Sequence, residues 1–155
     1  MLAAIRADDV NFPLFLHVLG AMLLVGTLLA VSTAILAGWR RADATEERAL
    51  TRFGLKTLLL GVLPSYVVMR IGAQWTESAE DLPDDFEPAW LGIGYITADA
   101  GALLILVSIV LSALGLRGLR REGGGTGLGR AVGVIATLLL AAYLVAVWAM
   151  SAKPD

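Results

Sequence analysis

The sequence predicts an all-α protein, a four-transmembrane-helix bundle, and three observations lead to this fold class. Four apolar runs are each long enough to cross a bilayer, which takes about 20 helical residues. Hydrophobic residues make up 57% of the 155-residue chain and charged residues only 17%, against about 25% in an average soluble domain. The mean hydropathy is +0.76. The length fits a single membrane domain, residues 1–155.

The first helix is expected at about residues 12–39. This apolar run is longer than the core of a signal peptide, which has about 7–15 apolar residues, so we interpret it as a retained membrane helix. Asn11 is a candidate N-cap, and Pro13 then falls near the first turn, where its missing N–H does no harm.

The second helix is expected at about residues 44–74, beginning in the aqueous phase. Pro64 lies in the middle of this span and removes one backbone hydrogen bond. A kink is therefore expected there, which membrane helices tolerate when neighbours satisfy the freed carbonyl. Residues 75–89 are rich in acids and prolines, and we interpret them as a solvated loop.

The third and fourth helices are expected at about residues 90–117 and 128–151, with a glycine-rich turn between them. Asp99 is the one charge in the run from Trp90 to Leu116. A carboxylate at membrane depth costs about 2.5–3.5 kcal/mol on insertion scales, and such residues are usually paired, buried in protein or functional. The position of Asp99 therefore predicts a polar partner on another helix.

The distribution of cations predicts the orientation. Nine cations lie in the two loops that follow the first and third helices, residues 40–56 and 117–130, and two lie on the other side, Arg6 and Lys153. Short loops rich in Lys and Arg stay in the cytoplasm. Both termini and the acidic loop are therefore expected outside, and the two basic loops inside.

Six residues are predicted to form a polar pocket in the outer leaflet. They are His17, Tyr66, Arg70, Tyr95, Asp99 and Tyr143. Counted from the helix ends at 1.5 Å per residue, they share the outer half of the bundle. Tyr66 and Arg70 are four residues apart, as are Tyr95 and Asp99. The two members of each pair therefore lie on the same face of their helix. Small residues near His17, such as Gly20 and Ala21, mark close helix contact.

Each of these residues also has a purely structural interpretation. Arg70 either pairs with Asp99 or an anion, or extends to the headgroups. Asp99 is either a structural ion-pair member or a ligand or proton site. His17 is either a packing histidine or a haem ligand, and the tyrosines are packing residues whose hydroxyls are satisfied in the pocket. Asp99→Leu with Arg70 left in place is expected to destabilise the protein by about 3–5 kcal/mol, because it leaves a buried charge without its partner.

Several classes of function lack their sequence signals. The chain has no cysteine, which excludes disulfides, thiolate metal sites and catalytic thiols. It contains no P-loop, no dinucleotide-type glycine motif and no HExxH. A net charge of −2 and no basic face outside the loops argue against nucleic acid. No catalytic residue and no metal site are predicted.

One segment resembles known families. The stretch LFLHVLGAMLLVGTLLA, Leu14 to Ala30, is similar to the first helix of bacterial four-helix membrane families, with Gly26 nine residues after His17. These families include copper-resistance-D-like proteins and predicted integral membrane proteins without an assigned activity. Relatives that bind haem or copper generally use more than one membrane histidine, so the second group is the better match. The resemblance implies a multi-pass protein of the bacterial plasma membrane.

Three functions are carried forward. The first is a small integral membrane protein without enzymatic activity, an accessory or ligand-binding subunit that works in a homo-oligomer or a larger membrane complex. The second is a membrane protein that binds b-type haem or another redox cofactor, with His17 as one ligand and Met69, Met150 or a second copy's histidine as the other. The third is a proton-coupled carrier that uses Asp99 as the titrating group.

Overall fold

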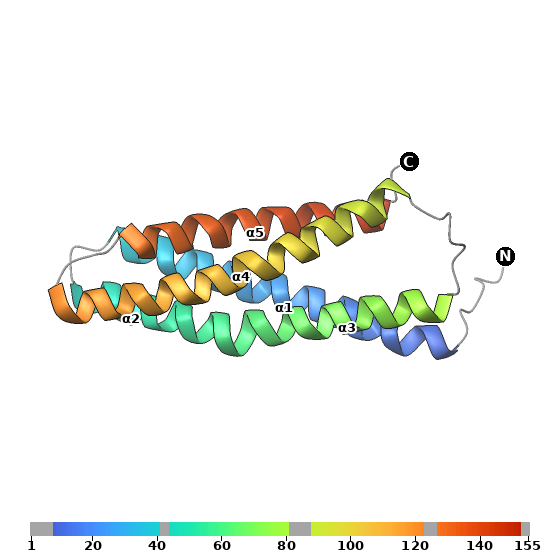
Figure 1. Ribbon diagram of the computed structural model, residues 1–155, viewed down its shortest axis with the longest axis horizontal. Helices are drawn as coiled ribbons and strands as arrows, with labels where there is room; N and C mark the ends of the chain where they lie inside the picture. Colours follow the sequence, from blue (N-terminus) through green and yellow to red (C-terminus); the bar gives the residue numbers. More distant parts are fainter. Residues whose placement is uncertain (1–7, 41–43, 81–87, 123–126, 153–155) are drawn as a thin grey trace.

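The chain folds as four long helical rods that run up and down beside one another (Figure 1). The computed structural model describes residues 8–40, 44–80, 88–122 and 127–152. Within these ranges all four rods are long and apolar enough to cross a membrane. The predicted all-α bundle of four helices is therefore confirmed, and the chain has the form of a multi-pass membrane protein.

The elements follow one another along the chain without strands in the described residues. They are α1 (Asp8–Trp39), α2 (Ala44–Thr57), a π-helical turn η1 (Leu58–Val62), α3 (Leu63–Glu80), α4 (Ala89–Glu122) and α5 (Gly127–Ala152). α2, η1 and α3 are continuous and together form the second rod. Much of both basic loops is therefore helical, because α2 begins at Ala44 and α4 continues to Glu122.

Three helices extend several residues beyond their predicted ends: α4, which continues to Glu122, and also α1 and α3. α1 begins at Asp8, so Asn11 and Pro13 lie inside the helix rather than at its start. α3 continues through Glu80, so residues 75–80 are helix and not part of a loop. Glutamate is a good helix former, and polar side chains do not end a helix that leaves the apolar layer. The rest of the predicted acidic loop, residues 81–87, lies outside the described residues.

Pro64 is preceded by a wide turn. Leu63 donates its N–H to the carbonyl of Leu58, five residues back, which is the π-helical spacing. Proline lacks an N–H, and in a regular α-helix its ring collides with the carbonyl four residues earlier. The π turn gives the backbone room at this point, so the second rod continues past Pro64 as one helix.

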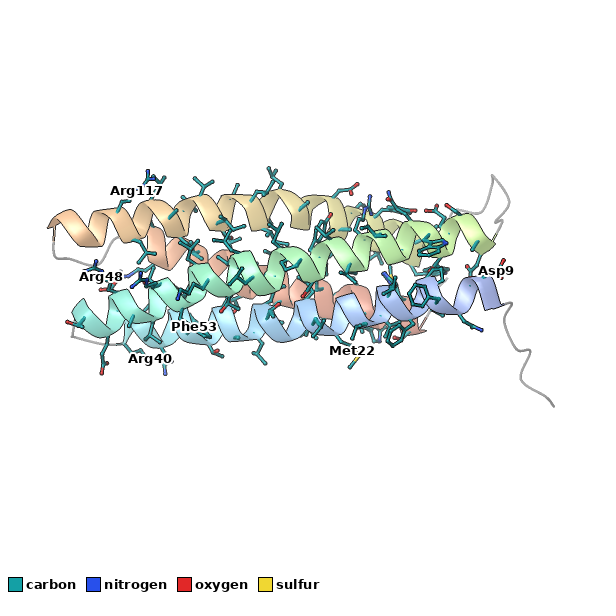
Figure 2. The ribbon with its side chains drawn as sticks, turned by 90° about the horizontal axis from the view of Figure 1, so that it is seen from below. Asp9, Met22, Arg40, Arg48, Phe53 and Arg117 are labelled. Carbon is teal, nitrogen blue, oxygen red and sulfur yellow. The ribbon has the colours of Figure 1, made fainter. Side chains whose placement is uncertain are left out.

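The two ends of the bundle differ in chemistry. We call the half that contains Asp8, Glu80, Ala89 and Ala152 the terminal half, and the other half the basic half. Arg40, Arg48 and Arg117 lie at one end and Asp9 at the other (Figure 2). The buried apolar core fills the basic half and the middle of the bundle; its largest members include Leu24, Leu28, Val31, Leu58, Val62, Ile105 and Val132.

Candidate functional site

In the terminal half the bundle contains a cleft of about 710 Å³, which we call the terminal cleft. Towards this end the rods separate into two pairs, α1 with α3 and α4 with α5 (Figure 1). The cleft lies between the pairs, and all four helices line it. Its walls are mostly apolar; its polar lining residues are His17, Arg70, Thr76, Glu77, Glu80, Tyr95, Tyr143 and Ser151.

The α1–α3 pair is held by two reciprocal glycines. A Cβ added to Gly20 would lie 2.6 Å from Met69 Cα, and one added to Gly72 would lie 2.8 Å from His17 Cα. Any larger residue at either glycine therefore collides with backbone of the other helix. This close approach allows His17 Nδ1 to lie 3.0 Å from the carbonyl oxygen of Met69.

The bond to Met69 sets the state of the His17 ring. A carbonyl oxygen can only accept, so Nδ1 of His17 carries the proton and donates it. In the neutral ring the other nitrogen, Nε2, is then an acceptor. Because His17 lines the terminal cleft, the histidine offers this cleft an acceptor or a metal-ligating nitrogen in a fixed orientation.

The α4–α5 pair positions Tyr143. This residue is 4% exposed and lines the cleft. Its hydroxyl is packed against Gly101 of α4, where a Cβ would displace it. Among the described residues the buried hydroxyl has no hydrogen-bond partner. A buried polar group without a partner costs about 1–3 kcal/mol, so Tyr143 Oη is an unused donor and acceptor beside the cleft.

Polar bonds join the two pairs on the α3–α4 side. Arg70 Nη2 lies 2.9 Å from Asp99 Oδ1, so the carboxylate has a basic partner on another helix. Tyr66 donates its hydroxyl to the carbonyl of Ala98 at 3.2 Å. Both bonds link α3 to α4.

Tyr95 has two partners on α3. It donates its hydroxyl to Glu77, and the guanidinium carbon of Arg70 lies 5.2 Å from the centre of its ring. The latter distance is within the range of a cation–π contact. Tyr95 therefore closes the α3–α4 side of the cleft together with the Arg70–Asp99 ion pair.

The opposite side, between α1 and α5, is open. In the basic half these helices touch closely, because a Cβ on Gly133 would lie 2.7 Å from the Trp39 ring. In the terminal half the cleft is bordered by exposed apolar side chains of both helices: Val18 and Met22 of α1 and Leu144 and Val147 of α5. In a bilayer this opening faces the hydrocarbon chains of the lipids rather than water.

The structure brings the six predicted pocket residues into one half of the bundle but not into one cavity. His17, Arg70, Tyr95 and Tyr143 line the terminal cleft. Tyr66 and Asp99 are not among the lining residues, and the Asp99 side chain is 67% exposed at the perimeter. Arg70 joins the two regions, because it lines the cleft and binds Asp99.

Sequence reasoning missed Glu77 and the role of the Met69 carbonyl. Glu77 was assigned to a solvated loop, although it follows Arg70 by two helical turns and therefore lies on the same face. That spacing could have identified it. No sequence signal points to the carbonyl of Met69 as the partner of His17. No cluster of three or more His, Asp or Glu side chains suited to a metal ion occurs in the described ranges.

Fold and cleft together define a class: a four-helix multi-pass membrane protein with a laterally open cleft between two helix pairs. Comparison of the chain with protein-family models, with curated proteins and with solved structures gives no match.

Proposed function

We propose that this chain is a small ligand-binding membrane protein that holds a lipid-soluble molecule in the terminal cleft, and that it is an accessory or binding subunit rather than an enzyme. The observation that carries this proposal is the lateral opening between α1 and α5, bordered by exposed apolar side chains. A ligand dissolved in the bilayer reaches such an opening without crossing water.

The lining indicates the chemistry of the ligand. Its body is apolar, because most of the cleft wall is apolar. Its head is compact and donates a hydrogen bond, since Nε2 of the neutral His17 ring is an acceptor. Hydroxylated rings and long-chain alcohols have this combination. Arg70 adds an attraction for a head with partial negative charge.

The cation distribution supports an orientation for this site. Arg40, Arg48, Arg52, Lys56, Arg117 and Arg130 lie in the basic half, which by the positive-inside rule faces the cytoplasm. Exposed Trp75 and Trp148 belong to the terminal half. We therefore assign the terminal cleft to the outer leaflet of a bacterial plasma membrane, with both termini outside.

Photolabelling tests the proposal. The protein is reconstituted with a diazirine-bearing long-chain alcohol, irradiated and mapped by peptide mass spectrometry. We expect labels on cleft residues such as Met69 and Met150. Ala21→Trp, which fills the cleft, is expected to remove them. The matched control Leu103→Trp, on a lipid-facing position that is 64% exposed, is expected to leave them in place.

The photolabelling result has a clear contrary outcome. Labels confined to outward-facing side chains in all three proteins would show that the cleft does not hold a lipid-soluble molecule. Equal cleft labelling in Ala21→Trp and in the unchanged protein would also contradict the proposal, because the tryptophan occupies the same space.

A second candidate is a b-type haem protein, and the bond from His17 to Met69 favours it. Histidines that bind metals usually donate their other ring N–H to a carbonyl or carboxylate, as His17 does. Met69, Met150 and Arg70 line the same cleft, so a methionine thioether would be available to bind the iron and Arg70 would be available to pair with a propionate. Bound haem would supply one-electron chemistry.

Absorption spectroscopy decides between the candidates. The haem proposal expects a Soret band in protein purified from haem-supplied cells and its loss in His17→Ala. A colourless preparation rules out haem and leaves the photolabelling prediction unaffected.

A further inference from the structure

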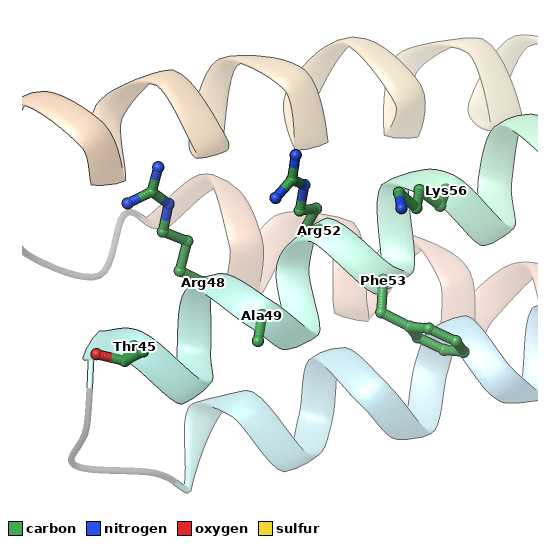
Figure 3. Close-up of a pocket in the computed structure, with 6 residues that line it drawn as sticks. All are labelled: Thr45, Arg48, Ala49, Arg52, Phe53 and Lys56. Carbon is green, nitrogen blue, oxygen red and sulfur yellow. The ribbon is translucent and has the colours of Figure 1, made fainter.

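A second hollow lies at the opposite end of the molecule, on α2. It has a volume of about 360 Å³ and is lined by Thr45, Arg48, Ala49, Arg52, Phe53 and Lys56 (Figure 3). We call it the basic hollow. We infer that it binds the phosphate headgroup of an anionic phospholipid from the leaflet at the basic end.

The spacing of the cations produces the hollow. Arg48, Arg52 and Lys56 follow one another at intervals of four residues, so they lie along one face of α2, about 6 Å apart along the axis. In Figure 3 the guanidinium groups of Arg48 and Arg52 point the same way, in the direction of α4, and Phe53 points away from them. Three cations thus surround one concave surface.

This arrangement carries uncompensated repulsion. Like charges four residues apart on a helix destabilise it by a few tenths of a kcal/mol per pair. In the part of the chain that the structure describes, no carboxylate forms an ion pair with these three cations. An anion bound between them removes the repulsion, which favours a negatively charged occupant.

The depth of the hollow identifies the source of the anion. About 30 Å of helix, the thickness of the hydrocarbon layer, separates Lys56 from Glu77, because 21 residues rise 1.5 Å each. With Glu77 near one boundary, Lys56 lies near the other. Arg48 and Arg52 then lie one to two turns farther out, among lipid headgroups.

Phe53 suits the same occupant. Its ring is 50% exposed and lines the hollow on the side away from the guanidinium groups. A soluble phosphate has no apolar surface that could pack on this ring, whereas the glycerol and upper acyl chains of a phospholipid can pack on it. The mixture of cations and an exposed aromatic ring therefore favours a phospholipid over free phosphate.

Native mass spectrometry of the detergent-purified full chain tests the inference with phosphatidylglycerol and phosphatidylcholine as probes. We expect preferential retention of phosphatidylglycerol. Since each Lys or Arg near an anionic surface contributes about 1 kcal/mol, Arg52→Gln is expected to lower that retention about fivefold. The matched control is Arg40→Gln, an exposed arginine at the same end outside the hollow, which is expected to change retention less than about twofold.

Three outcomes would overturn the inference. Equal losses in Arg52→Gln and Arg40→Gln would mean a general surface charge effect rather than a site. Equal retention of the two lipids would exclude an anionic headgroup site. Saturable binding of inorganic phosphate alone, without a preference between the lipids, would assign the hollow to a soluble anion. Arg48→Gln repeats the test should Arg52→Gln fail to fold, as judged by circular dichroism.

Discussion

The Arg70–Asp99 ion pair can be measured as an energetic coupling between α3 and α4. The perturbations are Arg70→Gln, Asp99→Asn and the double substitution, which form a double-mutant cycle. Arg70 Nη2 and Asp99 Oδ1 are 2.9 Å apart, and the two side chains are 23% and 67% exposed. The pair therefore lies at the perimeter of the bundle, with the arginine more covered than the carboxylate.

These exposures set the expected magnitude. A hydrogen bond to a charged group contributes about 1.5–3 kcal/mol, exposed ion pairs in water about 0.2–1 kcal/mol, and hydrogen bonds between membrane helices about 0.6 kcal/mol on average. We expect a coupling of about 1 kcal/mol. The 3–5 kcal/mol of a fully buried pair is too large, because Asp99 is exposed and Arg70 keeps its contact with the Tyr95 ring.

The assay is reversible unfolding in mixed micelles, with the helical circular dichroism signal followed as the denaturing detergent is increased. Each single substitution is expected to lower the free energy of unfolding, and the double substitution to cost less than the sum. Asp9→Asn, at an exposed site on α1, controls for the change in net charge. Additive costs, with a coupling under about 0.3 kcal/mol, would refute the view that this pair holds α3 to α4.

Three further predictions use the same unfolding assay. Gly20→Ala is expected to prevent or strongly weaken α1–α3 packing, since its Cβ would collide with Met69. The control Gly26→Ala, with open space around it, is expected to be neutral, and equal effects of the two substitutions would contradict the close contact. Tyr143→Phe is expected to keep or raise stability by up to about 1 kcal/mol, because it removes an unpartnered hydroxyl; a large loss of stability would reveal a partner. Ser108→Ala, at another buried hydroxyl without a partner among the described residues, is expected to be neutral or stabilising, and a cost above about 1 kcal/mol would contradict that assignment.

The fold and part of the site are predictable because the bilayer imposes simple rules on the sequence. Apolar run length predicted four spans, and the depth and spacing of Arg70 and Asp99 predicted that they share one half of the bundle. Both depend on distances along a helix axis, which a sequence contains directly.

The other features of the site depend on which helices contact one another. The spacing of residues along a single helix does not give these contacts. Gly20 and Gly72 are two of 17 glycines, and only the crossing of α1 and α3 makes them reciprocal. The cleft opens between α1 and α5, which are far apart in the sequence. Glu77 was assigned to solvent because its acidic neighbours suggested a loop, although Tyr95 provides it with a partner.

The π turn at Leu58–Val62 has a consequence for the angular relation between the two binding regions. A π turn accommodates one more residue than an α turn, and each residue of a helix advances by about 100°. Were the same residues wound as a regular α-helix, α3 would turn by roughly that angle relative to α2. The face that carries Arg70 would then point elsewhere while the face that carries Arg52 stayed in place. The π turn thus sets the angle, about the axis of the second rod, between the face that carries Arg52 and the face that carries Arg70. These two polar faces lie near opposite surfaces of the bilayer.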